Sequence, residues 1–174
     1  MAILPVITAP DPRLKVKSVP VEGVDREIRK LMEDMLETMY AAPGIGLSAI
    51  QVGVPKRVIV VDVARQGEER RPLRIANPEV IWASEERATY EEGCLSLPEQ
   101  FAEVERAAEV KVRYLDHENR QQEIHPSGML ATCIQHEIDH LYGILFVDHL
   151  SPIRRNIILR KLIKARKAKA QMSA

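Results

Sequence analysis

The chain has 174 residues, with 25 basic side chains, 25 acidic side chains and two cysteines. This length is typical of one compact domain, and two cysteines exclude a small scaffold held together by disulfides. No apolar run approaches the length of a membrane span, and the N-terminus lacks the pattern of a signal peptide. We therefore expect a single cytoplasmic domain over residues 1–174, with neither a membrane nor DNA as a partner.

The first third of the chain predicts an arm, a helix and a loop. Four prolines within residues 1–22 favour an irregular arm with at most a short turn. Asp25 can cap the helix that follows, in which apolar residues recur at the spacing of one helical face until Pro43. Beyond this helix, residues 44–51 predict a glycine loop.

The middle of the chain is rich in β-branched residues separated by turn signals. Five strands are expected, at residues 57–63, 73–76, 80–83, 109–115 and 121–125. Asn77 and Pro78 interrupt the second and third of them. The connections are too short for helical crossovers, which favours antiparallel pairing.

Two further helices are expected after the strands. The first is capped near Ser127, runs over residues 128–142 and stops at Gly143. Because apolar or ligand-type residues occupy both of its sides, it should be buried among the sheets. The second starts at Pro152 and runs to about residue 172. Its expected docking residues are Ile153, Ile157, Ile158 and Leu162. The predicted fold class is α+β, with mostly antiparallel β-sheets packed around a central helix and a helix at the C-terminus.

The central helix carries the residues best suited to chemistry. His136 and His140 lie one helical turn apart and can hold one ion, while Glu137 flanks that ion and can take a proton from water. A catalytic site needs a third ligand, and the candidates are Cys94, Cys133 and several carboxylates. Cys133 lies about 7.5 Å along the helix axis from the midpoint of the two histidines, which is too far for easy reach.

Three types of metal site and one further non-enzymatic alternative are compatible with these residues. One is a catalytic metal centre with an open position for water. Another is a closed structural site in which Cys94 and Cys133 complete a set of four ligands, which would leave Glu137 without a role. The last is a zinc endopeptidase, although a cysteine ligand argues against it. A non-enzymatic metal module that binds RNA through its basic end is the remaining alternative.

Three separated segments of the sequence bear on this choice. Residues 44–51 (GIGLSAIQ), 92–96 (EGCLS) and 135–140 (QHEIDH) resemble, in order and in spacing, the three signature motifs of bacterial peptide deformylases. The resemblance extends over about residues 3–165. It implies an enzyme that removes the formyl group from the N-formylmethionyl end of newly made polypeptides and releases formate.

The resemblance also implies roles for particular residues. Cys94, His136 and His140 would bind one divalent metal ion, Fe(II) in the native enzyme, with Zn, Ni or Co able to replace it. Glu137 would be the general acid and base, and the Gln51 amide and the Leu95 backbone N–H would hold the oxyanion. The substrate backbone would lie along the loop of Gly44, Ile45 and Gly46. Met129 and Cys133, beside the histidines, would form the wall of a pocket for the methionine side chain.

Two positions depart from the family pattern. Position 48 is commonly Ala, and Ser48 adds a hydroxyl near the oxyanion donor. Position 101 is commonly Arg, and this chain has Phe101. The metal and catalytic positions are unaffected, but the binding of the substrate beyond its first residue stays open.

The C-terminal helix is strongly basic. From Ser151 onward the chain has eight Lys and Arg residues and no acidic residue, whereas the first 150 residues carry a net charge of −8. Such a run is often only a solvated helix face. Because the implied substrate emerges from the ribosome, our hypothesis is that this helix contacts ribosomal RNA.

Overall fold

A computed structural model describes residues 2–173 of the chain. Its helices are α1 (Arg26–Ala41), α2 (Gly128–Leu141) and α3 (Pro152–Ser173), with 3-10 turns η1 (Pro12–Lys15), η2 (Ala49–Val52) and η3 (Phe146–His149). Its strands are β1 (Gly46–Ser48), β2 (Val58–Val61), β3 (Leu73–Ala83), β4 (Arg87–Cys94), β5 (Leu97–Ala107), β6 (Val110–Leu115) and β7 (Gln121–Ile124). Every strand pair is antiparallel.

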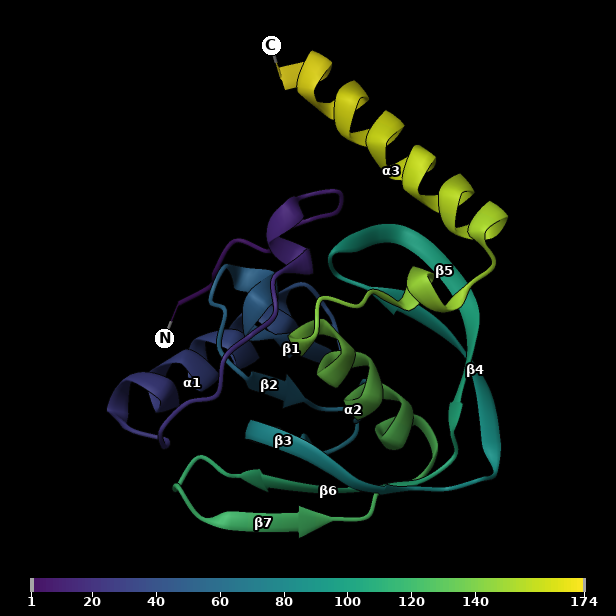
Figure 1. Ribbon diagram of the computed structural model, residues 1–174. Helices are drawn as coiled ribbons and strands as arrows, with labels where there is room; N and C mark the ends of the chain where they lie inside the picture. The colour runs from purple at the N-terminus through teal and green to yellow at the C-terminus, as the bar shows by residue number, and fades with distance from the viewer. Residues whose placement is uncertain (1, 174) are drawn as a thin grey trace.

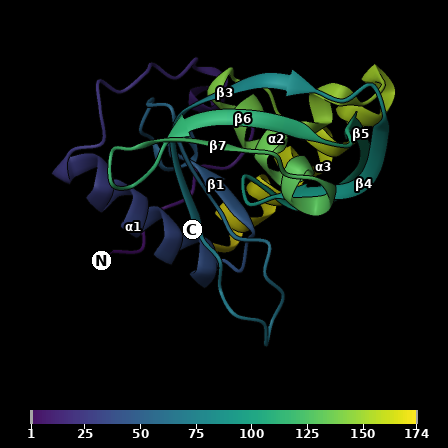
Figure 2. The same ribbon diagram turned by 90° about the horizontal axis from the view of Figure 1, so that it is seen from below.

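The strands form two sheets with α2 between them. The larger sheet has the order β1-β2-β3-β6-β7, and β4 and β5 form a separate two-stranded sheet. In two perpendicular views, α2 lies at the centre of the body, with strands of both sheets around it (Figures 1 and 2). The predicted α+β fold with antiparallel sheets around the helix of the two histidines is confirmed.

Apolar burial explains the central place of α2. On the side facing the larger sheet, Ile134, Ile138 and Leu141 pack into a cluster that includes Ile59 and Val112. A second apolar cluster joins β5, η3 and the start of α3. The third lies between α1 and β1–β2 and contains the buried methionines of α1. Burial of these side chains, at about 1.5–3 kcal/mol each, positions the helix against both sheets.

Several local predictions are confirmed by the structure. The helix α1 begins after Asp25, whose carboxylate accepts a hydrogen bond from the Ile28 N–H at 2.9 Å. The N-terminal arm contains only the short turn η1. The hairpin of β6 and β7 and the start of α2 after Ser127 lie where the pattern placed them.

Other predictions about the strands are wrong. Residues 44–51 are not a simple loop, because they contain the edge strand β1 and the turn η2. The two strands expected on either side of Asn77 and Pro78 are one strand, β3. It continues through an irregularity in register at this point, where Asn77 adopts a φ of 49°. The hairpin of β4 and β5 was not predicted, because its alternation of exposed charged residues and half-buried residues gives little apolar signal.

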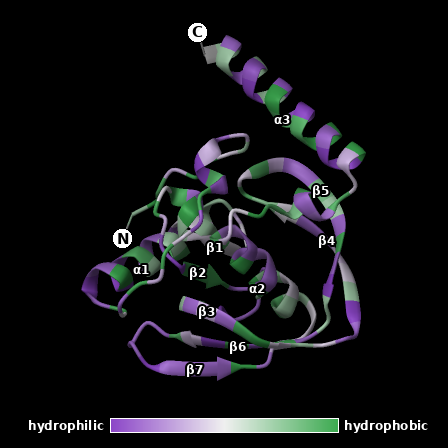
Figure 3. Cartoon of the chain, viewed as in Figure 1, coloured by the Kyte–Doolittle hydropathy of each residue, from purple (hydrophilic) through white to green (hydrophobic). Residues whose placement is uncertain are grey.

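The C-terminal helix is as long as predicted but docks less extensively. Ile158 and Leu162 are buried, whereas Ile153 is 75% exposed and Ile157 is 46% exposed. The expectation that all four dock is therefore wrong. Only one side of the early turns meets β5 and η3, and the rest of the helix projects away from the body (Figure 1). Much of the projecting part is hydrophilic (Figure 3). Among residues 2–173, no helix is both long enough and apolar enough to cross a membrane.

The chain's two phenylalanines offer a matched test of this packing. Phe146 is almost fully buried in η3, and Phe101 is 63% exposed. We expect Phe146→Ala to lower the free energy of unfolding by about 3–5 kcal/mol. Phe101→Ala should lower it by less than about 1 kcal/mol. Urea unfolding followed by circular dichroism measures both, and equal losses would contradict the packing described.

Candidate active site

Two segments far apart in the sequence, the end of β4 and the helix α2, meet at this site. Cys94 ends β4, and His136 and His140 come from adjacent turns of α2. The ligand-type atoms of these three residues all lie within 4.8 Å of one another. The Cys94 Sγ is 3.4 Å from the His140 Nε2, and the two imidazole centroids are 5.0 Å apart. The folded chain thus brings together the three residues expected to bind metal.

The chemistry of this cluster fits a divalent cation. One sulfur and two imidazole nitrogens form a donor set that several divalent metals accept. Two buried polar atoms beside it, the Glu137 Oε1 and the His140 Nδ1, have no hydrogen-bond partner among the described residues. Buried polar atoms normally have partners, so the unpartnered carboxylate oxygen is suited to a water or substrate group beside the ion.

Cys133 does not belong to this cluster. Its thiol donates a hydrogen bond to the Ile45 carbonyl at 3.5 Å. Burial raises its pKa well above the ordinary value, and the nearby Glu137 carboxylate adds to the effect. A metal ligand must be a thiolate, so these surroundings favour a wall residue over a fourth ligand. The structural four-ligand site therefore has no support from the geometry.

A buried ionic network holds His136 in place. The His136 Nδ1 lies 2.9 Å from a Glu92 carboxylate oxygen, so the Nδ1–H donates to Glu92 and the ring is held with its Nε2 turned away from that carboxylate. Arg106 donates to both oxygens of Glu92, at 2.7 and 2.9 Å, and to Asp139 at 2.8 Å. Asp139 lies beside His140 in the sequence, so the network reaches both turns of the helix that carry the two histidines.

The charged groups of this network shift one another's pKa values. Burial alone would raise the pKa of Glu92, but hydrogen bonds from His136 and Arg106 outweigh it and lower the pKa. Burial alone would lower the pKa of His136, and its bonds to Cys94 and Glu92 instead raise it well above the usual range. In contrast, burial lowers the pKa of His140. Glu92 therefore stays ionised and can orient the imidazole of His136.

Glu137 lies between the cluster and the open side of the site. It is 2% exposed, and its Oε1 lies 3.9 Å from the His140 Nε2. Burial raises its pKa from 4.5 to about 7. A carboxyl group with this pKa can both accept and return a proton near neutral pH. Gly46 allows this position, because a Cβ on it would lie 2.6 Å from the Glu137 Oε2.

Gln51 is held rigidly with its amide nitrogen toward the cluster. Its Oε1 accepts hydrogen bonds from the Ser48 N–H at 2.9 Å and from the Ser48 hydroxyl at 3.0 Å. Its Nε2 donates to the Ser96 hydroxyl at 2.9 Å and lies 3.5 Å from the Cys94 Sγ. The backbone N–H of Ser48 can only donate, so a flipped amide would place two donors against each other. The Ser48 hydroxyl, a departure from the family pattern, adds a second hydrogen bond to the same Gln51 oxygen.

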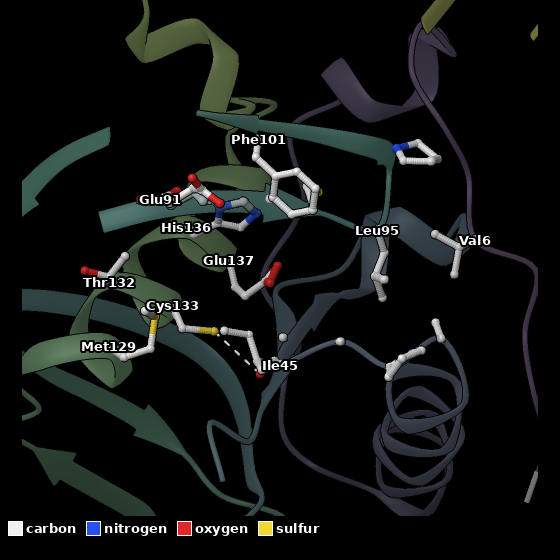
Figure 4. A pocket seen from close by; sticks show the side chains of 18 of the residues that line it. Val6, Ile45, Glu91, Leu95, Phe101, Met129, Thr132, Cys133, His136 and Glu137 are labelled. Carbon is white, nitrogen blue, oxygen red and sulfur yellow. Dashed lines mark hydrogen bonds and ion pairs between the residues drawn. The ribbon is translucent and has the colours of Figure 1, made fainter. Parts of the chain in front are cut away.

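A cavity of about 610 Å³ opens above these groups. Met129, Thr132 and Cys133 line it from α2, and Gly44, Ile45 and Gly46 line it from the segment leading into β1. Figure 4 shows Cys133 and Met129 beside Ile45, with Glu137 between them and Phe101. Its volume lies within the range of small-ligand sites. Every residue expected to bind substrate therefore lies on this cavity.

Sequence reasoning missed several residues of the site. The sequence patterns assign no role to Glu92, Arg106 or Asp139, although the three form the network around His136. Thr132 was overlooked on the cavity wall, and so was Ser96 beside Gln51. The signal that could have revealed the network was Glu92, a charged residue at a buried strand position. Its partners Arg106 and His136 lie more than ten residues away along the chain, so no local pattern identifies them.

Comparison with known proteins decides the family. The family model described as polypeptide deformylase matches residues 3–156. The chain belongs to the polypeptide deformylase family. A peptide deformylase of Phenylobacterium zucineum is 59% identical over 97% of this chain and 99% of its own length. That of Rhizobium meliloti is 55% identical over 97% of both chains. A crystal structure of the Ehrlichia chaffeensis deformylase superposes with a TM-score of 0.93 at 40% identity, covering 97% of this chain and 99% of that one.

Family membership confirms the enzymatic class expected from the three motifs. The chain is a metal-dependent hydrolase that removes the formyl group from newly made polypeptides. A divalent metal is the cofactor of this family, and the residues Cys94, His136 and His140 offer a site that could hold one.

The Glu92 bond to His136 generates a test of the ionic network. Groups that orient a metal ligand typically change metal affinity about 10- to 100-fold when mutated. We expect Glu92→Gln to weaken metal binding by that factor, because the amide is neutral and pairs less strongly with His136 and Arg106. Glu91→Gln, at the exposed neighbouring position, is the matched control. Competition with a chromophoric chelator measures both, and equal affinities would contradict the role given to Glu92.

The raised pKa of Glu137 predicts a pH-dependent stability of the metal-free protein. Because folding raises the pKa from 4.5 to about 7, the folded state binds this proton more tightly. That stabilisation is complete below the unfolded pKa and is lost as the pH rises through the folded pKa. From about pH 5.5 to about pH 8.5, the wild type should lose about 2 kcal/mol relative to Glu137→Gln. Urea unfolding in the presence of a chelator checks this, and parallel stability profiles would contradict it.

Proposed function

We propose that Cys94, His136 and His140 hold one divalent cation, which is iron(II) in the cell and can be replaced by zinc, nickel or cobalt. The observation that supports this most is the convergence of these three residues around Glu137 at the base of the cavity. Mixed thiolate and imidazole ligands suit several ions, which is why more than one metal should give an active enzyme.

The proposed chemistry assigns a role to each polar group at the site. A bound divalent cation supplies Lewis acidity, which polarises the formyl carbonyl and makes water more acidic. Glu137 accepts the proton of the attacking water and later gives it to the departing amine. The Gln51 amide nitrogen and the Leu95 backbone N–H donate hydrogen bonds to the oxygen of the formyl group. Since Gln51 is held by Ser48 and Ser96, its donor needs no reorientation as charge develops.

The substrate chain is proposed to bind in extended form between the two sheets. In the described part of the chain, β1 pairs with β2 alone and β4 pairs with β5 alone, so each has an edge without a strand partner. The cavity is lined by residues of both strands. A peptide can add to such an edge through its backbone. Its methionine side chain would enter beside Met129 and Cys133, where an unbranched, polarizable group fits an irregular apolar wall.

The enzyme is further proposed to act in the cytoplasm, at the ribosome, through α3. Ile158 and Leu162 are buried against the core, Leu159 packs beside them, and the second half of the helix carries Lys and Arg without any acidic residue. A projecting cationic helix suits the phosphate backbone of ribosomal RNA, near which formylated chains emerge. An ion pair of 2.8 Å between Arg155 and Asp148 helps fix the base of the helix.

The experiment that tests the function is anaerobic turnover of an N-formyl-Met tripeptide, with metal content measured on the same sample. We expect rapid formate release with about one metal ion per chain, and no hydrolysis of the matched N-acetyl-Met tripeptide. A folded, fully metallated sample that fails to hydrolyse the formyl peptide would overturn the proposal.

Gln51 provides the mutational prediction. Removing one oxyanion donor typically costs about 2.7–4 kcal/mol, so Gln51→Ala should lower kcat about 100- to 1000-fold. The side-chain oxygen of Gln51 also accepts hydrogen bonds from Ser48. Gln51→Glu is therefore needed as a second variant, because it keeps this acceptor and loses the amide donor. Both variants should be slow, and Gln66→Ala in an exposed turn should match the wild type. Wild-type kcat in Gln51→Glu would exclude the donor role.

The ribosome contact predicts a salt-dependent affinity. Replacing Lys164, Arg166 and Lys167 by Gln should weaken ribosome co-sedimentation at low salt and leave hydrolysis of short peptides unchanged. The slope of log affinity against log salt concentration should become less steep by about 1 for each removed cation that contacts a phosphate. The control removes three exposed cations elsewhere, at Arg65, Arg113 and Arg120. Equal co-sedimentation of both triple variants would refute the contact.

A further inference from the structure

Phe101 is an exposed aromatic side chain on the wall of the active-site cavity. Its side chain is 63% exposed and lines the same cavity as Glu137 and Cys133. A lone exposed apolar residue is ordinary on a protein surface. What distinguishes Phe101 is its fixed position on the wall of the active-site cavity.

The ring is held against a glycine that precedes a residue of the metal cluster. Phe101 and Gly93 are paired across β4 and β5. A Cβ on Gly93 would lie 2.5 Å from the Phe101 Cε1 and 2.6 Å from its Cδ1, so the ring covers the space that a side chain would fill. Packing an aromatic ring over a glycine on the opposite strand stabilises such a pair. The ring is thus ordered before any ligand arrives, and a contact with it costs little conformational entropy.

The other residues at the rim of the cavity near Phe101, namely Val6, Leu95, Glu91 and Glu99, are apolar or acidic. In Figure 4, Val6 and Leu95 lie on one side of the Phe101 ring and Glu91 lies on the other. Glu99 adds a second exposed carboxylate, and among the described residues that line the cavity there is no Lys or Arg. An apolar side chain can therefore bury area against this rim, whereas an acidic one meets like charge.

We propose that Phe101 selects the residues that follow methionine in the substrate. Its exposed face binds an apolar or aromatic side chain at one of the first two positions after methionine, and Glu91 and Glu99 disfavour an acidic residue there. This inference depends on the proposed function and deepens it. Methionine itself is held elsewhere, beside Met129 and Cys133, so Phe101 affects only the choice among formylated chains.

The test compares kcat/KM for two peptide series, formyl-Met-Xaa-Ala and formyl-Met-Ala-Xaa, in which Xaa is Ala, Phe or Glu. An aromatic pair should make the wild type prefer Phe over Ala by about 3- to 10-fold in one series. Phe101→Ala should reduce that preference to less than about twofold. Phe101→Tyr should retain the preference, and Phe101→Arg should raise the relative rate of the Glu peptide.

Trp82→Ala is the matched control, because Trp82 is also an exposed aromatic residue, at 43%, and does not line the cavity. It should leave both series unchanged. Identical preferences in the wild type and in Phe101→Ala would overturn the inference while leaving the proposed function intact. Failure of the wild type to hydrolyse any formyl peptide would overturn the proposed function and this inference with it.

Discussion

The Glu92 carboxylate, buried between His136 and Arg106, is the contact on which the site depends. Taking an ionised carboxylate out of water costs several kcal/mol unless its oxygens are fully hydrogen-bonded. Here Arg106 bonds both oxygens and His136 bonds one of them, so the charge is compensated only when β4, β5 and α2 are assembled. The hairpin and the helix are thereby fixed in one register. Because Cys94 follows Glu92 by two residues, the same contact places the thiol beside the two histidines.

Burial also sets the chemistry of Glu137. The apolar walls of the cavity remove water from this carboxyl group and raise its pKa to about 7. The glycine at position 46 leaves just enough space for it. A polar residue on the wall would weaken this effect on the pKa.

The parts of the molecule that the core does not fix face the substrate and the surroundings. The outer turns of α3 contain exposed cations and no acidic residue, and the Phe101 ring lies exposed on the rim of the cavity. Neither feature is needed to bury the apolar clusters. The metal-ligand candidates and Glu137 lie on the central helix and the β4–β5 hairpin, while the α3 cations and the Phe101 ring lie at the surface, where substitutions cost little stability.

The sequence by itself determined the helices, most strands of the larger sheet and the residues that meet at the active site. Helical spacing, capping residues and β-branched runs are local signals, and the three motifs carry the ligands and Glu137 in recognisable order. Only the tertiary structure decided that β4 and β5 form a separate hairpin, that Arg106 and Glu92 hold His136, and that Ile153 and Ile157 remain exposed. These features depend on contacts between residues distant in the sequence. These contacts form only when the elements pack together, so a local sequence pattern does not predict them.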